Sequence, residues 1–245
     1  IVQKVLSNEL NKLSKSAFND VGIVGSVKGT TIKNALGLCI GYYKSGFKYV
    51  LKTDVQDYFP SISKKRLKKC FFEQIKDQSL RSYFDKYLGQ SSKPGIPQGP
   101  PLSPYMANLY LYKLDKYLAG QKHLRHIRYL DDLVIFCRDE ESAANTYQVV
   151  SRMFTNLQLK IHPLGTPGKT FIDHFDSGRV DVLGVIYKND FLYIKPKKYK
   201  NFLAENITPL KFKSCLNKNG ANASESLEDL LLDLGFKLNG WIGAY

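Results

Sequence analysis

The sequence has few cysteines, and none of them is placed to share a metal ion or to build a disulfide framework. Cys39, Cys70, Cys137 and Cys215 are scattered along the 245 residues, and no two form a Cys-x-x-Cys pair. Scattered thiols are typical of a reducing compartment, so we expect a cytoplasmic location. The sequence also lacks a signal peptide and any apolar run of the ~20 residues that a membrane helix needs. We therefore expect no membrane partner.

Acidic residues are outnumbered by basic ones. The chain has 22 Asp and Glu against 36 Lys and Arg, which gives a formal net charge of +14. A folded protein that is basic along its whole length favours a polyanionic partner, of which nucleic acid is the usual one. A basic protein that is merely soluble is the alternative. The hydrophobic content of 43% is enough for one large domain or two small ones with a core.

The apolar pattern predicts an α+β protein. The expected elements, in chain order, are a helix over 2–18, a helix over 31–44, a strand over 47–53, a helix over 64–76 capped by Ser63, a loop over 93–101, a helix that starts at Ser103-Pro104, a hairpin over 124–137, a helix over 140–158, a hairpin of 180–187 and 191–195 around Asn189-Asp190, and a basic helical segment after Pro196. This order fits a sheet with helices on one face, followed by a small helical domain. The expected buried residues of the helix after Ser103 are Met106, Leu109, Leu114, Tyr117 and Leu118.

Three acidic residues stand where carboxylates are costly unless they bind a cation. Asp131 and Asp132 lie in the expected hairpin turn, and Asp54 directly follows an apolar strand. An ordinary Asp-rich turn and a strand-end cap are the alternative interpretations. If the strand ends are neighbours, the three carboxylates can hold two Mg²⁺ ions about 3.5–4 Å apart for in-line phosphoryl transfer.

A third segment, from Gly95 to Pro104, is a stiff loop of Gly and Pro residues that leads into a helix N-terminus. Such a loop can deliver Gln98 to a base pair or a nucleotide. A Gly/Pro loop without a ligand is the alternative interpretation.

These three segments, in this order and at this spacing, resemble motifs A, B and C of reverse transcriptases. The likeness is greatest to the bacterial group II intron, retron and phage-defence enzymes, and it runs from about residue 2 to the end. The matching residues are 54–62 for motif A, 95–99 with Ser103-Pro104 and Ala107-Asn108 for motif B, 129–132 for motif C, Lys169-Thr170 for motif D, 183–185 for motif E and 239–245 for a thumb segment.

The resemblance implies a polymerase right-hand fold. Partial fingers are expected over 1–46, a palm with an antiparallel sheet and helices over 47–195 with a fingers/palm loop around 77–101, and a C-terminal helical thumb over 196–245. The implied function is an RNA-directed DNA polymerase that extends a primer with dNTPs, in a bacterial retroelement or an antiviral defence system. The implied partners are an RNA template, a DNA primer or an RNA/DNA hybrid, and a cognate noncoding RNA or partner protein.

The resemblance also implies the catalytic residues. Asp54 and Asp131 would be the main metal ligands, Asp132 would support them, and the Val55 carbonyl would add an oxygen. The implied cofactor is a pair of Mg²⁺ ions, for which Mn²⁺ can substitute. Lys169 would protonate the departing pyrophosphate or hold its charge.

The implied nucleotide-binding residues are Asp57, Tyr58, Phe59 and Gln98. Phe59 falls where the family places a steric gate, a large ring that clashes with a ribose 2′-hydroxyl and so selects dNTPs. A buried core Phe is the alternative interpretation. Gln98 would contact the templating pair or the incoming nucleotide.

The implied primer and template contacts come from three places. Tyr129 would lie against the primer end, and Leu183 and Gly184 belong to a segment that would grip the primer backbone. Lys197 and Lys198 of the thumb would reach phosphates, although a solvated basic face is an equal alternative.

The sequence departs from the family pattern at three places. Leu130 stands where these bacterial relatives usually have Ala, and Pro100-Pro101 stiffens motif B. The basic fingers residues that hold the triphosphate in the family are expected upstream of residue 1, since Lys28 and Lys33 are poor substitutes for them.

Two other functions remain open from the sequence. An untemplated or protein-primed DNA polymerase of a defence system would use the same acids. A non-catalytic RNA-binding maturase or scaffold would not need three costly carboxylates beside an anionic ligand, which argues against it.

Overall fold

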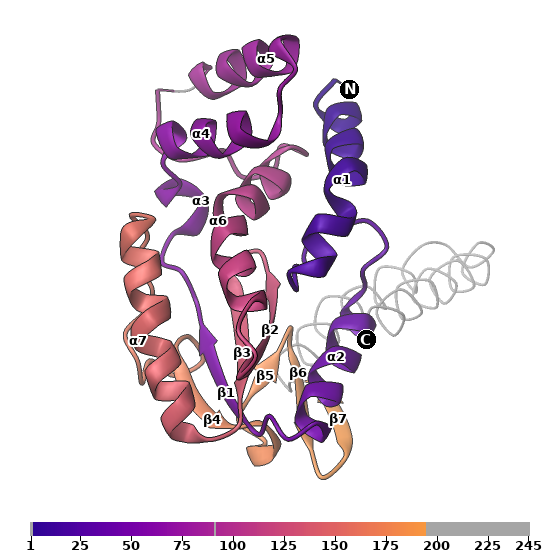
Figure 1. Cartoon of the computed structure of the whole chain (residues 1–245), viewed down its shortest axis with the longest axis vertical. Coiled ribbons are helices and arrows are strands. Elements are labelled where there is room, and N and C mark those ends of the chain that lie inside the picture. Colours follow the sequence, from indigo (N-terminus) through magenta and orange to yellow (C-terminus); the bar gives the residue numbers. More distant parts are fainter. Residues whose placement is uncertain (1, 91, 195–245) are drawn as a thin grey trace, which may run out of the picture. The chain divides into compact units, whose positions relative to one another are not determined.

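A computed structural model describes residues 2–90 and 92–194 of the chain (Figure 1). The predicted thumb over 196–245, with Lys197 and Lys198, lies outside the described residues. The chain divides into two compact units, residues 1–175 and 176–245, and each is described by itself. The predicted boundaries at residues 46 and 195 concern functional subdomains and stay a prediction.

Four antiparallel strands form the sheet of the first unit, in the order β2-β3-β1-β4. Their bounds are β1 (Tyr49–Thr53), β2 (Leu124–Tyr129), β3 (Asp132–Cys137) and β4 (Phe171–His174). The central strand β3 is buried from Leu133 to Cys137 without interruption. A strand that is apolar on every residue must be covered on both faces.

Helices do cover both faces of this sheet (Figure 1). α6 (Ser103–Ala119) and α7 (Glu140–Asn156) share the main core with Leu51 and Ile135. α2 (Ile32–Lys44) covers the opposite face, where the ring of Tyr42 lies edge-on to Phe136 with 5.7 Å between centroids. The expectation of helices on one face is therefore wrong, because both sides of β3 carry apolar side chains.

The helix α1 (Val2–Asp20) confirms the first predicted helix. It packs on α6 through Phe18, whose ring centroid lies 5.8 Å from that of Tyr105. The loop that follows α1 then runs beside the end of β2, where Ile23 forms a parallel bridge with Arg128.

Three helices follow β1 and precede α6 in the chain. They are α3 (Tyr58–Ser61), α4 (Lys64–Gln74) and α5 (Gln78–Gly89). Ser63 caps α4 as predicted. α5 corrects the expected loop around 77–101, because residues 78–89 are helical and the Asp77 carboxylate caps them by accepting the Leu80 N–H at 2.8 Å.

The start and the buried face of α6 differ slightly from the prediction. Leu102 is the N-cap residue, so Ser103 is already helical. Met106, Leu109, Leu114 and Leu118 are buried as expected, whereas Tyr117 is 42% exposed.

The second unit is described over residues 176–194. It holds a three-stranded sheet in the order β5-β6-β7, with β5 (Asp181–Val182), β6 (Val185–Lys188) and β7 (Phe191–Ile194), and a 3-10 turn (Phe175–Ser177) leads into it. Asn189 and Asp190 have φ of 50° and 62°, as a two-residue hairpin turn requires, which confirms the predicted hairpin.

Over residues 2–90 and 92–194, no helix combines the length and the apolar character needed to cross a membrane.

Candidate active site

The register of the two central strands brings the three predicted acids to one end of the sheet. Thr53 of β1 pairs with Leu133 of β3, so the next residue, Asp54, follows β1 where Asp132 begins β3. Asp131 lies in the turn between β2 and β3. Burial raises the pKa of the Asp131 carboxyl, and the negative charge of Asp54 raises that pKa further. The two carboxylates are therefore close enough to repel each other.

Basic side chains face these acids. The Lys169 ammonium donates a hydrogen bond to Asp54 Oδ2, and this bond raises the pKa of Lys169. Lys52 Nζ lies 3.4 Å from Asp132 Oδ1, and the Lys52 side chain is only 6% exposed. His162 Nε2 lies 3.9 Å from Asp54 Oδ2. Lys52 and His162 were missed from the sequence, although Lys52 stands two residues before Asp54 on the same strand.

The donor set suits a hard divalent cation, although the side chains are not arranged as a ready-made metal centre. Within residues 2–90 and 92–194, no three His, Cys, Asp or Glu side chains are grouped so that they could hold a metal ion. Carboxylate oxygens are nevertheless the ligands that Mg²⁺ prefers. Burial first and the charge of Asp54 second raise the pKa of Asp131, and a cation between Asp54 and Asp131 would favour the charged form of both carboxylates.

The segment after Asp54 divides its side chains between the interior and the surface. Val55 is buried and forms an isolated bridge with Ile161, and Asp57 is exposed with a left-handed φ of 44°. Tyr58 is 3% exposed, and its hydroxyl donates to the Ala107 carbonyl of α6 at 2.6 Å. The Tyr58 side chain therefore supports the site from the core and offers little surface to a nucleotide.

The Phe59 backbone is joined to the predicted motif B loop. The Ile96 N–H donates to the Phe59 carbonyl at 3.0 Å. Gly95 has a φ of +78°, and a Cβ atom there would lie 2.4 Å from the Phe59 oxygen and from Pro60 Cα. Only glycine permits this approach, which fixes the Phe59 backbone. The exposed Gln98 follows two residues after Ile96, the residue that is bonded to Phe59.

The primer-contact predictions fall in two separate units. Tyr129 is 36% exposed at the end of β2, directly before the acidic turn. Leu183 and Gly184 form the turn between β5 and β6 in the second unit, with φ of 54° and 88°. Their part in primer binding stays a prediction.

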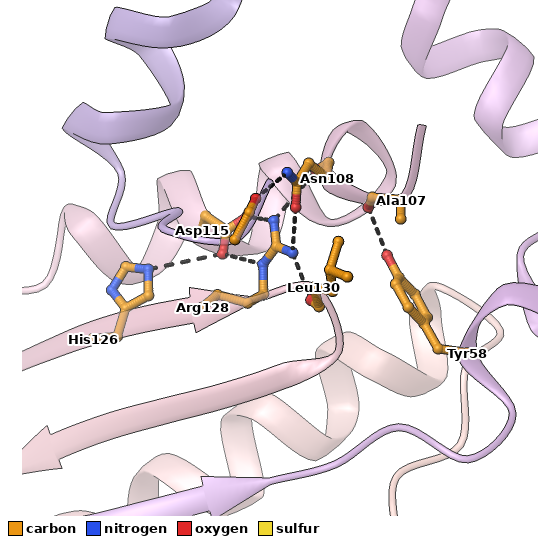
Figure 2. A network of polar contacts seen from close by, with 8 residues as sticks. Tyr58, Ala107, Asn108, Asp115, His126, Arg128 and Leu130 are labelled. Atoms are coloured by element: carbon orange, nitrogen blue, oxygen red, sulfur yellow. Dashed lines mark hydrogen bonds and ion pairs between the residues drawn. The ribbon is translucent and has the colours of Figure 1, made fainter. Parts of the chain in front are cut away.

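A buried polar network lies behind the acidic turn, and the sequence interpretation did not include it (Figure 2). Arg128 and Asp115 are both fully buried, and Arg128 Nη2 donates to Asp115 Oδ2 at 2.7 Å. Arg128 also donates to the Leu130 carbonyl at 2.6 Å and to Asn108 Oδ1 at 3.1 Å. The available signal was a charged residue at an inward position of a strand, since Leu124, His126 and Arg128 lie on alternate positions and all three are buried.

With this geometry, the chain can be compared with known proteins. Residues 1–187 match the family described as reverse transcriptase (RNA-dependent DNA polymerase). The match covers more than half of the chain, so the protein belongs to the reverse transcriptase family.

Two curated proteins are similar to it in sequence. The Retron Ec86 reverse transcriptase of Escherichia coli is 29% identical over 204 residues, which cover 82% of this chain and 59% of that protein. An uncharacterized 91 kDa protein in the cob intron of Schizosaccharomyces pombe is 23% identical over 234 residues, which cover 87% of this chain and 29% of that protein. The chain thus spans less than two thirds of the length of either relative.

Solved structures with a similar fold include telomerases bound to a TWJ fragment of telomeric RNA. The Candida tropicalis telomerase has a TM-score of 0.60 at 13% identity and matches 99% of this chain and 46% of its own. The Candida albicans telomerase has a TM-score of 0.58 at 13% identity and matches 99% and 47%. At such identities the likeness concerns the mixed α+β fold alone.

Proposed function

We propose that the protein is an RNA-directed DNA polymerase that extends a primer with dNTPs by two-metal-ion nucleotidyl transfer. One observation carries the proposal: the pairing of β1 with β3 brings Asp54 to the end of the sheet where Asp131 and Asp132 lie. Membership of the reverse transcriptase family supports the same chemistry. The untemplated or protein-primed alternative uses the same acids and differs in whether it needs a template or an added primer.

In this proposal Asp54 and Asp131 hold the cations and Asp132 supports them. A pair of Mg²⁺ ions would supply the charge that lowers the pKa of a primer 3′-hydroxyl and neutralises the pyrophosphate. Val55 would contribute through its backbone carbonyl. Mn²⁺ is a suitable substitute because it takes the same oxygen ligands.

Lys169 acts in this proposal as a mobile cation. Its side chain is 51% exposed, so its ammonium has room to leave Asp54 and to meet a departing pyrophosphate. The charged ammonium is suited to hold the negative charge of the pyrophosphate. Once it leaves Asp54 it loses the hydrogen bond that raises its pKa, so it can also donate a proton as the P–O bond breaks. Lys52 is buried and stays on Asp132, where it limits the negative charge of the pair.

The nucleotide would lie against the Phe59 ring and Gln98. The hydrogen bond from Ile96 fixes the Phe59 backbone, so the ring has a defined position from which to exclude a 2′-hydroxyl. Tyr129 offers an exposed ring to the primer end. The thumb residues Lys197 and Lys198 would reach phosphates of the RNA/DNA hybrid.

The similarity to the Retron Ec86 reverse transcriptase favours a bacterial retroelement or an antiviral defence system as the setting. A cognate noncoding RNA or a partner protein would then be part of the assembly, and the net charge of +14 suits an RNA partner.

The test is primer extension with the purified protein, Mg²⁺, dNTPs and a DNA primer annealed to RNA. We expect template-matched DNA, and we expect Asp131→Asn to reduce the rate by at least about 100-fold, since it removes one charged ligand. Glu73→Gln is the matched control, because Glu73 is an exposed carboxylate on α4 that pairs with Lys113.

Three results would change the proposal. Products that form equally well without a template or without an added primer would favour the untemplated or protein-primed enzyme. Activity that survives in Asp131→Asn would remove these acids from the chemistry. A folded protein that binds RNA but makes no DNA with its native RNA partner would favour the RNA-binding scaffold.

A further inference from the structure

The turn that carries Asp131 contains a backbone conformation that its residue disfavours. Leu130 has a φ of 56°, in the left-handed region that a leucine rarely adopts. Such conformations persist only when the surrounding structure determines them, and they gather at functional sites. The contacts that hold Leu130 are therefore a guide to what positions the acid next to it.

Arg128 makes the decisive contact. Its Nη1 donates to the Leu130 carbonyl at 2.6 Å. This carbonyl belongs to the peptide group that joins Leu130 to Asp131, and a peptide group is planar. Fixing the oxygen therefore fixes the plane of the Leu130–Asp131 peptide group. The orientation of this plane in turn determines the direction in which the Asp131 side chain points.

The guanidinium of Arg128 is itself held on every side (Figure 2). Nε and Nη2 donate to the two carboxylate oxygens of Asp115 at 2.8 and 2.7 Å. Nη1 and Nη2 also donate to the side-chain and backbone oxygens of Asn108 at 3.1 and 3.3 Å. With the bond to Leu130, each of the five N–H groups has an acceptor, which leaves the side chain a single orientation.

The loop after α1 also holds the turn. Asn108 Nδ2 donates to the Gly25 carbonyl at 2.8 Å. A Cβ atom on Gly25 would lie 2.8 Å from Leu130 N and from Tyr129 Cα. The Val24 N–H donates to the Arg128 carbonyl at 2.9 Å. The turn is thus enclosed between α6 and the loop after α1.

A buried ion pair is a poor device for stability, because well-packed apolar residues of the same volume are often as stable or more so. Its supported use is to specify one conformation among several. We propose that Arg128, held by Asp115 and Asn108, is a positioning residue that fixes the Leu130–Asp131 peptide and so aims the Asp131 carboxylate at the cation it shares with Asp54. This inference rests on the proposed function and deepens it.

The test compares Arg128→Lys and Asn108→Leu with the unmodified protein. Lysine keeps the charge beside Asp115 but cannot hold five acceptors at once. Leucine has the branched shape and the number of side-chain heavy atoms of Asn108 and leaves the Arg128–Asp115 pair in place, so it serves if Arg128→Lys does not fold. Arg125→Lys is the matched control, since Arg125 is on the same strand but donates to the carbonyls of Lys122 and Leu124 and lies over the Phe47 ring, 4.8 Å from its centroid.

Mn²⁺ binding to the protein alone, followed by electron paramagnetic resonance, is the first readout. We expect both variants to melt cooperatively and to bind Mn²⁺ about 10- to 100-fold more weakly, as when partners of metal ligands are changed. In primer extension we expect kcat to fall while the KM for dNTP stays the same, and we expect a higher Mg²⁺ concentration to restore part of the rate. Arg125→Lys should match the unmodified protein in both.

Folded variants with unchanged Mn²⁺ affinity and unchanged kcat would overturn the positioning role. The two proposals fail in different ways. An unmodified protein that binds Mn²⁺ but does not extend a primer would refute the polymerase function, while the difference in Mn²⁺ affinity would still decide the role of Arg128. If both variants lose cooperative melting and the molecules that remain folded bind Mn²⁺ normally, the contacts of Arg128 with Asp115 and Asn108 stabilise the fold and do not position Asp131.

Discussion

At the scale of single residues, neighbouring aromatic rings take different tasks. Tyr58 turns inward, and its hydroxyl is bonded to the Ala107 carbonyl. Phe59 is half-buried, with its ring centroid 5.8 Å from that of Tyr58 in an edge-on arrangement. The adjacent positions differ because the short helix α3 sends one side chain into the core and leaves the next at its edge.

This difference predicts distinct effects of two substitutions. Phe59→Val removes the ring, so a ribonucleotide should compete better. We expect the preference for dNTP over rNTP, as a ratio of kcat/KM values, to fall by about 10- to 200-fold, the range for a pocket that loses bulk. Tyr58→Phe is the matched control: it should lower the unfolding free energy by about 1 kcal/mol and leave the sugar preference unchanged. An unchanged preference in Phe59→Val would mean that another residue excludes the 2′-hydroxyl.

At the scale of elements, the segments predicted to be motifs A and B are joined, because a glycine lets their backbones approach closely. A Cβ atom on Gly95 would lie 2.4 Å from the Phe59 oxygen and 2.5 Å from the Pro60 oxygen. Gly99, in the same loop, also has a positive φ, of +102°, but no atom would lie within 4 Å of a Cβ atom added there. A comparison of substitutions at the two glycines therefore distinguishes the effect of steric contact from that of backbone strain.

Gly95→Ala should destabilise the protein more than Gly99→Ala does. Both substitutions strain a positive φ, at a cost on the order of 1–3 kcal/mol. Gly95→Ala must in addition push the loop away from Phe59, so we expect a further loss of stability and a weaker dNTP preference. Urea unfolding of both variants, with the sugar preference measured beside it, checks this. Equal losses in the two variants would show that the Gly95 contact has no special role.

Local signals predicted those elements that local chemistry determines. Ser63 caps α4, and the acidic turn lies between β2 and β3, because a cap and a tight turn depend on a few consecutive residues. The helix α5 was missed although Asp77 supplies an N-cap, because its segment was assigned to the loop that contains motif B.

Tertiary features were beyond the sequence pattern. The Arg128 network joins three segments, the loop at Gly25, α6 at Asn108 and Asp115, and β2, and no spacing rule links them. Likewise α2 covers the second face of the sheet, which becomes clear only once β3 is known to be central. The three acids could be predicted as a group because motif resemblance placed them, while the basic partners Lys52 and His162 required the strand register.

At the scale of the whole molecule, the positive charge and the buried histidine make stability depend on pH. The net charge is +14, so each added proton increases self-repulsion. A polyanion would oppose this by stabilising the folded state through binding. Measurements of intrinsic stability should therefore be made without nucleic acid.

His126 gives this dependence a definite sign. Burial lowers the pKa of His126, the charge of Asp115 raises it in part, and Arg128 lowers it again. The groups that face the ring are Asp115 on α6, whose Oδ1 lies 3.8 Å from Nε2, Arg128 on the same strand, and the Val21 backbone in the loop after α1. The folded protein therefore holds His126 neutral more strongly than the unfolded chain does.

The contribution of His126 to stability is then fully present above the unfolded pKa of about 6.5 and is lost as the pH falls below it. We expect the unfolding free energy of the unmodified protein to fall as the pH drops below about 6.5, with His126 contributing a slope of at most about 1.4 kcal/mol per pH unit. His126→Gln should flatten that part of the profile. His123→Gln is the matched control, because His123 is exposed just before β2. Urea unfolding at a series of pH values measures the slopes, and equal slopes in His126→Gln and the unmodified protein would assign the acid loss to groups other than His126.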